Sequence, residues 1–220
     1  KPIKEKAGFL VLRSNFFDTA IMKMSVVNDE FIERYLSDPS NPNIFIAKAI
    51  VFDGPEDYHK NINNPDLNID EKCILVMRGC GPIGYPGSAE VVNMQPPDEL
   101  LKKGISSLPC IGDGRQSGTS ESPSILNVSP EAAVGGGLAI IKNGDEIKID
   151  LNKKRADLLL EDEVIRERLK NNNYKYPDNQ TPWQEISRKF TGQLSDGACL
   201  NLEESYFDIA NSKGIPRDSH

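Results

Sequence analysis

The sequence predicts a mixed α/β, strand-rich body over residues 1–170 and a helical C-terminal extension over residues 171–220. Short apolar runs of strand length, separated by turn residues, indicate the body. The 17 glycines and 15 prolines form no low-complexity linker, which indicates tight, shaped loops between these runs. One polar stretch, residues 171–180, reads as a linker before two amphipathic helical patterns.

The predicted strands are apolar runs, several of them rich in β-branched residues. They are Phe9–Arg13, Ile44–Phe52, Ile74–Arg78, Leu108–Ile111, Leu138–Ile141, Glu146–Leu151 and Ala156–Leu160. Phe9–Arg13 and Ile74–Arg78 read as buried strands. The dipeptide Asn143-Gly144 is typical of a tight turn between two strands.

The predicted helices begin and end at recognisable residues. Pro55 suits the first turn of a helix over Glu56–Asn61, and Gly104 ends a helix over Asp98–Lys103. A helical pattern runs through Met94, and another helix covers Asp162–Leu169. In the extension, one apolar face is formed by Trp183, Ile186 and Phe190, and a second by Leu202, Tyr206, Ile209 and Ala210.

Composition narrows the functional classes. The 26 Lys and Arg against 33 Asp and Glu give a net charge of −7, which argues against nucleic acid as a partner. No apolar run reaches the roughly 20 residues that span a bilayer, and the polar N-terminus does not resemble a secretory signal. We therefore expect a cytoplasmic protein with no membrane partner. The four cysteines form no CxxC pair and are expected to be reduced thiols.

Two glycine-containing loops carry the candidate chemistry. The first loop, Gly79–Glu90, reads GCGPIGYPGSAE and ends on a carboxylate near an expected helix start. The second loop, Ile111–Ser122, reads IGDGRQSGTSES and gathers acidic, basic and hydroxyl groups after a short strand. Neither GK[ST] nor G-x-S-x-G is present. From local pattern alone, a purely structural turn remains the alternative for the first loop, and a solvated turn remains the alternative for the second. Of the two histidines, His59 is expected on a helix surface and His220 is the last residue.

Together, GPIGYPGSAEVVNM (residues 81–94) and LPCIGDGRQSGTSESPSILNVSPEAAVGGGLAIIKNGD (residues 108–145) resemble the C-terminal part of the dihydroxy-acid dehydratase and 6-phosphogluconate dehydratase family. The segment AIVFDGPEDYH (residues 49–59) and the tail TPWQEI…GQL…GIPRDSH (residues 181–220) are similar to its sugar-acid branch, the arabinonate and xylonate dehydratases. The resemblance covers nearly the whole chain.

The resemblance implies a β-barrel-like swivelling domain with flanking helices, similar to the mobile domain of aconitase, with the helical extension packed on it. It also implies a reaction in which a 2,3-dihydroxy acid loses water to give a 2-keto-3-deoxy acid. An iron–sulfur cluster would bind the leaving 3-hydroxyl, Mg²⁺ would hold the carboxylate and 2-hydroxyl, and a base would remove the C2 proton.

Site residues follow from the same resemblance. Glu90 matches a metal-ligating carboxylate. Ser117 matches the serine proposed as the base, acting as an alkoxide, and Thr119 matches a hydroxyl beside the substrate. Three further candidates for substrate contact are Asp113, Arg115 and His220. For the first two, a buried Asp–Arg pair that braces the loop is the alternative.

The resemblance also places the cluster ligands and the remaining metal ligands in an N-terminal domain that these 220 residues do not contain. Cys80 would lie near the cluster without ligating it, and Glu121 stands where relatives tend to have a small residue. The expected partners are that N-terminal domain, a small sugar acid and further copies in a dimer or tetramer. The chain alone is expected to be inactive.

Two rival interpretations stay open at this point. One is a dihydroxy-acid dehydratase of branched-chain amino-acid synthesis, from the same family. The other is a stand-alone binding or assembly domain that keeps the fold without catalysis.

Overall fold

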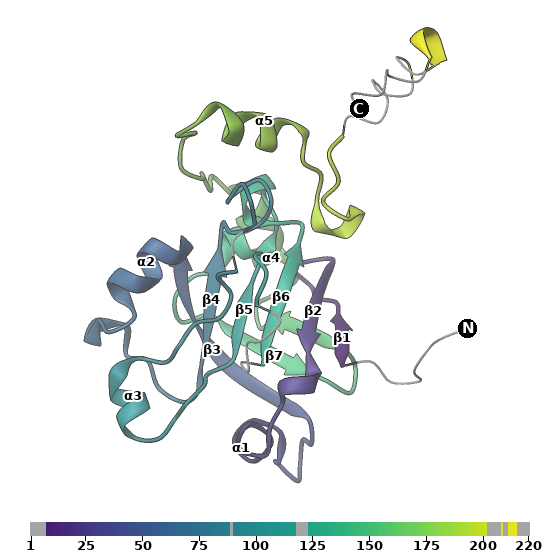
Figure 1. Ribbon diagram of the computed structural model, residues 1–220. Coiled ribbons are helices and arrows are strands. Elements are labelled where there is room, and N and C mark those ends of the chain that lie inside the picture. The colour runs from purple at the N-terminus through teal and green to yellow at the C-terminus, as the bar shows by residue number, and fades with distance from the viewer. Residues whose placement is uncertain (1–7, 89, 118–122, 202–207, 209–210, 215–220) are drawn as a thin grey trace.

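The computed structural model describes residues 8–88, 90–117, 123–201, 208 and 211–214 of the chain. An eight-stranded sheet in the order β1-β2-β6-β5-β4-β3-β7-β8 forms the body, and helices flank it (Figure 1). The predicted mixed α/β, strand-rich fold is confirmed.

The sheet has a parallel centre and antiparallel sides. Strands β3, β4, β5 and β6 run parallel, while β2 and β1 on one side and β7 and β8 on the other pair antiparallel. The strands are β1 (Phe9–Leu12), β2 (Thr19–Lys23), β3 (Ile44–Asp53), β4 (Cys73–Arg78), β5 (Cys110–Gly112), β6 (Ser124–Ser129), β7 (Glu146–Asp150) and β8 (Arg155–Leu158).

Backbone contacts between its two outer strands close the sheet. Arg13, directly after β1, bridges Arg155 on β8. The Arg13 N–H donates to Lys154 O and the Ala156 N–H donates to Arg13 O, each at 3.0 Å. Closing a sheet in this way removes exposed edge strands. The predicted barrel-like architecture is therefore confirmed.

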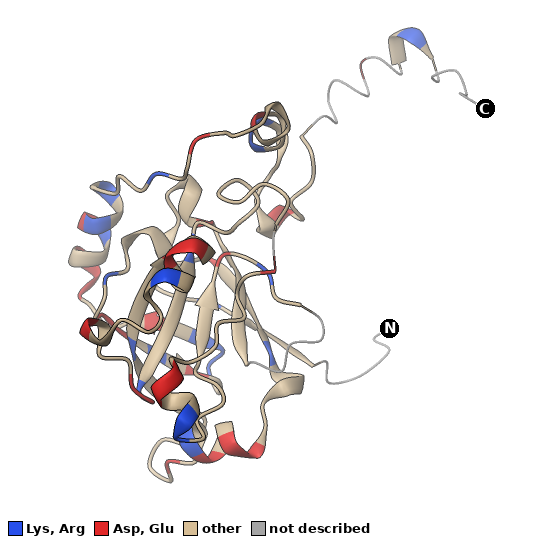
Figure 2. Ribbon diagram, turned by 60° about the vertical axis from the view of Figure 1, so that its left-hand side comes forward, with Lys and Arg blue, Asp and Glu red and all other residues tan. Residues whose placement is uncertain are grey.

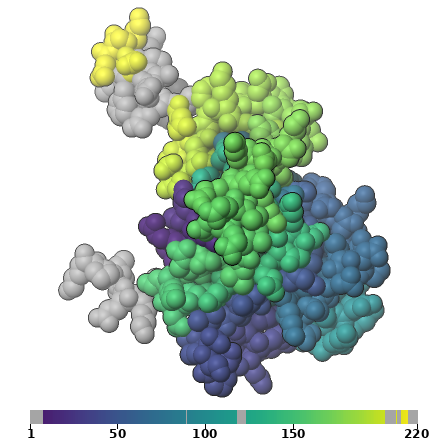
Figure 3. Space-filling model, turned by 180° about the vertical axis from the view of Figure 1, so that it is seen from behind, coloured from purple at the N-terminus to yellow at the C-terminus, as the bar shows by residue number. Residues whose placement is uncertain are grey.

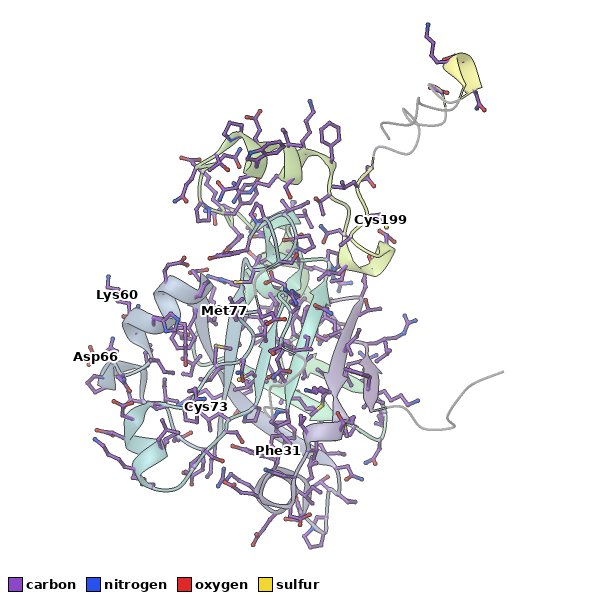
Figure 4. The ribbon with its side chains drawn as sticks, in the orientation of Figure 1. Phe31, Lys60, Asp66, Cys73, Met77 and Cys199 are labelled. Atoms are coloured by element: carbon purple, nitrogen blue, oxygen red, sulfur yellow. The ribbon has the colours of Figure 1, made fainter. Side chains whose placement is uncertain are left out.

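Strand β4 shows why one strand of this barrel reads as an uninterrupted apolar run. Ile74 and Val76 belong to one buried cluster, while Cys73, Leu75 and Met77 belong to a second. Cys73 and Met77, labelled in Figure 4, lie in the cluster that also contains residues of α2 and α3. A strand covered on both faces needs apolar side chains at every position.

The helices are α1 (Asp29–Phe31), which continues as a π-helical turn over Ile32–Leu36, α2 (Gly54–Asn61), α3 (Asp98–Lys102), α4 (Asp162–Lys170) and α5 (Pro182–Phe190). Pro55 lies in the first turn of α2, as predicted, and His59 is exposed on that helix. A capping box between Thr181 and Gln184 begins α5.

Residues 171–201 form a layer over one end of the body in the space-filling view (Figure 3). The apolar face predicted on α5 is largely exposed there, with Trp183 78% exposed. The second predicted apolar face, over residues 202–210, falls almost entirely outside the described residues.

Three predictions about local structure were wrong. Leu138–Ile141 is not a strand, because Gly137–Ile140 forms a 3-10 turn that buries Leu138 and Ile140 in the core. A short apolar run of this kind is compatible with either structure. The chain from Glu90 to Met94 is extended instead of helical, since Val92 N–H bonds to Arg115 O and two prolines follow.

The third error concerns β1. The strand exists, but Phe9 and Val11 are more than half exposed and only Leu12 is fully buried, because the outer face of this strand has no covering element among the described residues. Strands β2 and β6 and the helical turns over 29–36 were not predicted at all.

Charge is dispersed over the surface. In the view of Figure 2, acidic and basic residues alternate along the helices and loops of the described chain. Among the described residues, no helix combines the length and apolar character needed to cross a membrane.

Candidate active site

The two candidate loops meet at one end of the barrel because the strands before them are parallel. The first loop follows β4, the second loop follows β5, and Glu131 comes two residues after β6. Adjacent parallel strands place their carboxyl ends on the same edge of a sheet, where α/β folds commonly bind ligands. Topology therefore brings together segments that are about 30 residues apart in the sequence.

Asp113 links these three segments. Its carboxylate accepts the N–H groups of Gly79 at 3.0 Å, Cys80 at 2.8 Å and Ala132 at 2.8 Å. The side chain is 0% exposed. Burial raises its pKa from 3.8 to about 6, although the three N–H donors oppose that change and nearby Glu131 adds to it. Asp113 thus braces both loops from inside the fold, through backbone groups and not through Arg115.

The pH dependence of stability is expected to report on Asp113. Because its pKa is raised on folding, its contribution is full below about pH 4 and is lost as the pH passes about 6. The free energy of unfolding of the unaltered chain, minus that of Asp113→Asn, should fall by up to about 3 kcal/mol between about pH 4 and about pH 7. Urea unfolding across that range measures this difference. A difference that rises with pH would show that the three N–H donors outweigh burial.

The first loop turns around Glu131. This carboxylate is 0% exposed and accepts the N–H groups of Ile83 at 3.0 Å and Gly84 at 2.8 Å. A Cβ on Gly81 would overlap the Glu131 side chain, and one on Gly84 would lie 2.5 Å from Gly79 O. Glycine is required at these two positions because neighbouring atoms leave no room for a Cβ, and not because the backbone is left-handed.

Gly84→Ala is expected to lower the free energy of unfolding by about 1–3 kcal/mol, because the backbone of Gly79 must shift to admit the methyl group. Gly192→Ala is the matched control, since its Cβ would meet nothing closer than 3.5 Å. Urea denaturation of both variants makes the comparison. Equal stability of the two would contradict the close approach seen at Gly84.

Glu90 and Arg115 join the two loops at the surface. The Arg115 Nη1 group donates to Glu90 Oε1 at 2.6 Å, and Arg115 Nε donates to Ser88 O at 2.5 Å. Both side chains are nearly half exposed, at 49% for Arg115 and 42% for Glu90. A ligand can therefore reach the Glu90 carboxylate. The buried Asp113–Arg115 pair considered above does not form.

The remaining predicted residues are placed as follows. Ser117 is half-buried, two residues after Arg115 on the second loop. Thr119, Glu121 and His220 lie outside the described residues. The structure thus brings Glu90, Arg115 and the Ser117 segment to one end of the barrel.

The described residues do not by themselves form a metal site. They contain no group of three or more His, Cys, Asp or Glu side chains that would hold a metal. The exposed Glu90 carboxylate fits as a single oxygen ligand of a site completed by other groups. All four cysteines are free, as predicted, and Cys73, Cys80 and Cys110 are buried.

Burial keeps two of these thiols protonated. It raises the pKa of Cys73 to about 11, and it raises the pKa of Cys80 further, with Asp113 adding to the effect. Among the described residues, no thiol belongs to a group of three or more metal-ligating side chains, such as a cluster needs.

Sequence reasoning missed Glu131, Arg188 and Gln193. Gln193 Nε2 donates to Glu131 Oε1 at 2.9 Å, and Arg188 donates to carbonyls of the first loop. The available signal for Glu131 was a charged residue inside the otherwise small and apolar run PEAAVGGG. For Arg188 and Gln193, no local pattern distinguishes them from solvent-exposed polar residues.

Comparison with known proteins identifies relatives. The family model described as "Dihydroxy-acid/6-phosphogluconate dehydratase C-terminal" matches residues 1–198. A D-xylonate dehydratase of Caulobacter vibrioides is 58% identical over 220 residues, which is 100% of this chain and 37% of that protein. An L-arabinonate dehydratase of Rhizobium leguminosarum bv. trifolii is 42% identical over 223 residues, covering 100% of this chain and 36% of that protein.

A dihydroxy-acid dehydratase of Methanococcus aeolicus is more distant, with 35% identity over 204 residues, 91% of this chain and 34% of that protein. The chain therefore spans little more than a third of the length of these curated relatives.

Proposed function

Because the chain belongs to the dihydroxy-acid/6-phosphogluconate dehydratase family, as its C-terminal domain, we propose that it is the catalytic C-terminal part of a sugar-acid dehydratase. The observation that carries this proposal is the alignment of the entire chain with a D-xylonate and an L-arabinonate dehydratase at 58% and 42% identity. The meeting of both loops at the carboxyl ends of parallel strands supports it.

The proposed reaction is the elimination of water from a 2,3-dihydroxy acid. A base takes the proton from C2, the C2–C3 double bond forms, and hydroxide leaves C3 with a proton as water. The resulting enol tautomerises to the 2-keto-3-deoxy acid. A divalent cation such as Mg²⁺, and an iron–sulfur cluster held outside this chain, would supply the positive charge that makes C2–H more acidic and hydroxide a better leaving group.

Glu90 and Arg115 would prepare the metal-binding part of the site. The Glu90 carboxylate would be this chain's ligand to the divalent cation. The Arg115 guanidinium holds Glu90 at 2.6 Å and also bonds Ser88 O, so it orients the carboxylate before any ligand binds.

Ser117 would take the C2 proton, and Thr119 would place a hydroxyl group beside the substrate. A serine hydroxyl is a very weak base at neutral pH. Nearby positive charge must therefore lower its pKa, so that it can act as an alkoxide. Arg115, two residues earlier in the sequence, would be one source of that charge.

We propose three further features of the whole enzyme. Its N-terminal portion would complete the site, since this chain spans 37% of the Caulobacter relative. The complete protein would form a dimer or tetramer. It would lie in the cytoplasm, a reducing compartment that fits the four free cysteines.

The test uses a chimeric enzyme in which this chain replaces the matching C-terminal part of the Caulobacter relative. D-Xylonate, L-arabinonate and 2,3-dihydroxyisovalerate are supplied separately, and 2-keto acid formation is measured. We expect kcat/KM for at least one sugar acid to exceed that for dihydroxyisovalerate by about 10-fold or more. The reason is that a sugar acid carries additional hydroxyl groups, and the enzyme can form one or more hydrogen bonds to them. A preference for dihydroxyisovalerate would instead support a dehydratase of branched-chain amino-acid synthesis.

A further inference from the structure

The peptide unit between Ile83 and Gly84, in the first loop, lies between two side chains of opposite charge. Its carbonyl oxygen, Ile83 O, accepts Arg188 Nε–H at 2.8 Å. Its amide, Gly84 N–H, donates to Glu131 Oε2 at 2.8 Å. This peptide is trans, so its C=O and N–H point in opposite directions. The cation and the anion therefore face the matching ends of one peptide dipole.

The neighbouring peptide units are held by the same two side chains. Glu131 Oε1 accepts the Ile83 N–H at 3.0 Å, and Arg188 Nη2 donates to Gly84 O at 3.2 Å. Three consecutive peptide units are thus fixed by hydrogen bonds in which one partner carries a full charge. Such bonds are shorter and stronger than those between neutral groups. The four residues Ile83, Gly84, Glu131 and Arg188 together form what we call the peptide clamp.

Both charged members of the peptide clamp are themselves fixed in place. Glu131 is buried two residues after β6 and accepts a further hydrogen bond from Gln193. The Arg188 guanidinium stacks on the Tyr176 ring at 4.4 Å and donates to Asn179 Oδ1. An arginine already held on two sides loses little further freedom when it binds the loop.

A short series of bonds connects the peptide clamp to Glu90. Tyr85 N–H bonds to Gly81 O at 2.8 Å, and Ser88 N–H bonds to Tyr85 O at 3.0 Å. Ser88 O in turn accepts from Arg115, which holds Glu90. Two tight turns and the Arg115 guanidinium thus form a continuous series of hydrogen bonds between Ile83–Gly84 and the Glu90 carboxylate.

We propose that Arg188 is a positioning residue: acting through Ile83–Gly84, it fixes the first loop and so the place of the Glu90 carboxylate. This inference rests on the proposed function. It gives the C-terminal extension a task in catalysis, since α5 supplies the only cation of the clamp while contributing no buried residue to the core of the described chain.

The first experiment measures the loop in the 220-residue chain itself. Arg188→Ala should speed amide hydrogen exchange at Ile83 and Gly84 by about 10-fold or more and shift the NMR signals of Glu90 and Arg115. Lys189→Ala is the matched control, because it removes the same charge from the same helix at an exposed position. Both variants should keep the thermal midpoint of the unaltered chain within about 2 °C, since Arg188 lies outside the core.

The second experiment uses the chimeric enzyme. Arg188→Ala should raise the Mg²⁺ concentration for half-maximal activity and lower kcat, each about 10-fold, with KM for the sugar acid changed less. Millimolar guanidinium ion added to Arg188→Ala should restore part of kcat, and Lys189→Ala should match the parent. Rescue by guanidinium is not expected of a residue that only stabilises the fold.

Unchanged exchange and NMR signals in Arg188→Ala would overturn the positioning role. So would a perturbed loop with kcat and Mg²⁺ dependence equal to the parent, and that result would leave the proposed function intact. An inactive parent chimera would count against the proposed function instead. The shift or constancy of the Glu90 signal in the 220-residue chain would then decide the positioning role by itself.

Discussion

Ser117→Ala in the chimeric enzyme is expected to lower kcat for the sugar acid by about 10³-fold, within the range of about 10²–10⁴ that a positioned base contributes. The alanine methyl group cannot accept the C2 proton, and no other group of the second loop between 112 and 117 is suited to do so. Asp113 is fully buried and bonded to three N–H groups, while Arg115 is a cation bonded to Glu90.

KM should change far less than kcat in this variant, because the proton is transferred only in the transition state. Ser106→Ala, an identical change at an exposed position before β5, serves as control and should match the parent. Steady-state assays of both variants decide the point. Turnover of Ser117→Ala equal to that of the parent would remove Ser117 from the role of base.

Glu90→Gln is expected to raise the Mg²⁺ concentration for half-maximal activity by about 10–100-fold and to lower kcat by about 100-fold at saturating metal. The amide keeps the size of the side chain but carries no charge to attract the cation. It also loses the charge of the ion pair with Arg115, whose guanidinium can then donate only to a neutral amide oxygen and to Ser88 O.

Glu163→Gln is the matched control, since Glu163 also forms a surface pair with an arginine, Arg166. Titration of activity with Mg²⁺ gives the comparison. If the half-saturating concentration of Glu90→Gln equals that of the parent, Glu90 is not a metal ligand.

Strands with a strong local signal could be predicted from the sequence. The run Ile44–Phe52 is dense in β-formers and appears as β3, and Ile74–Met77 is apolar throughout because β4 is buried on both faces. Helix α2 was recognisable from Pro55. Each of these signals arises within a few residues, so it can be read without knowledge of the rest of the chain.

Features that depend on long-range contacts could not be predicted in this way. The closure of the barrel joins Arg13 to Lys154 and Ala156 through backbone groups, and the side chain of Asn15 bonds the backbone of Leu158 beside it, 143 residues away in the sequence. Residues 138–141 have strand-like composition, yet Gly137–Ile140 forms a 3-10 turn, and Gly137 packs against the backbone of Phe16. The outcome there depends on a segment more than 100 residues away.

The candidate site shows the same division. The resemblance supplied Glu90, Ser117 and Thr119, and it named Asp113 as a candidate for substrate contact or as half of a bracing pair, but it gave neither the bonds by which Asp113 holds the loops nor Glu131. Asp113 and Glu131 act by accepting backbone N–H groups, and any segment of chain offers such donors. Only the three-dimensional arrangement shows that Asp113 and Glu131 fix the loops, whereas the carboxylate of Glu90 remains accessible to a ligand.

The most direct test of the proposed function is the formation of 2-keto-3-deoxy acid by the chimeric enzyme. D-Xylonate and L-arabinonate are supplied with Mg²⁺ and reconstituted iron and sulfide, and the Caulobacter relative without its C-terminal part is assayed beside it. We expect product from the chimera and none from the shortened relative. A folded chimera that carries its metals and yields no keto acid from either sugar acid would contradict it.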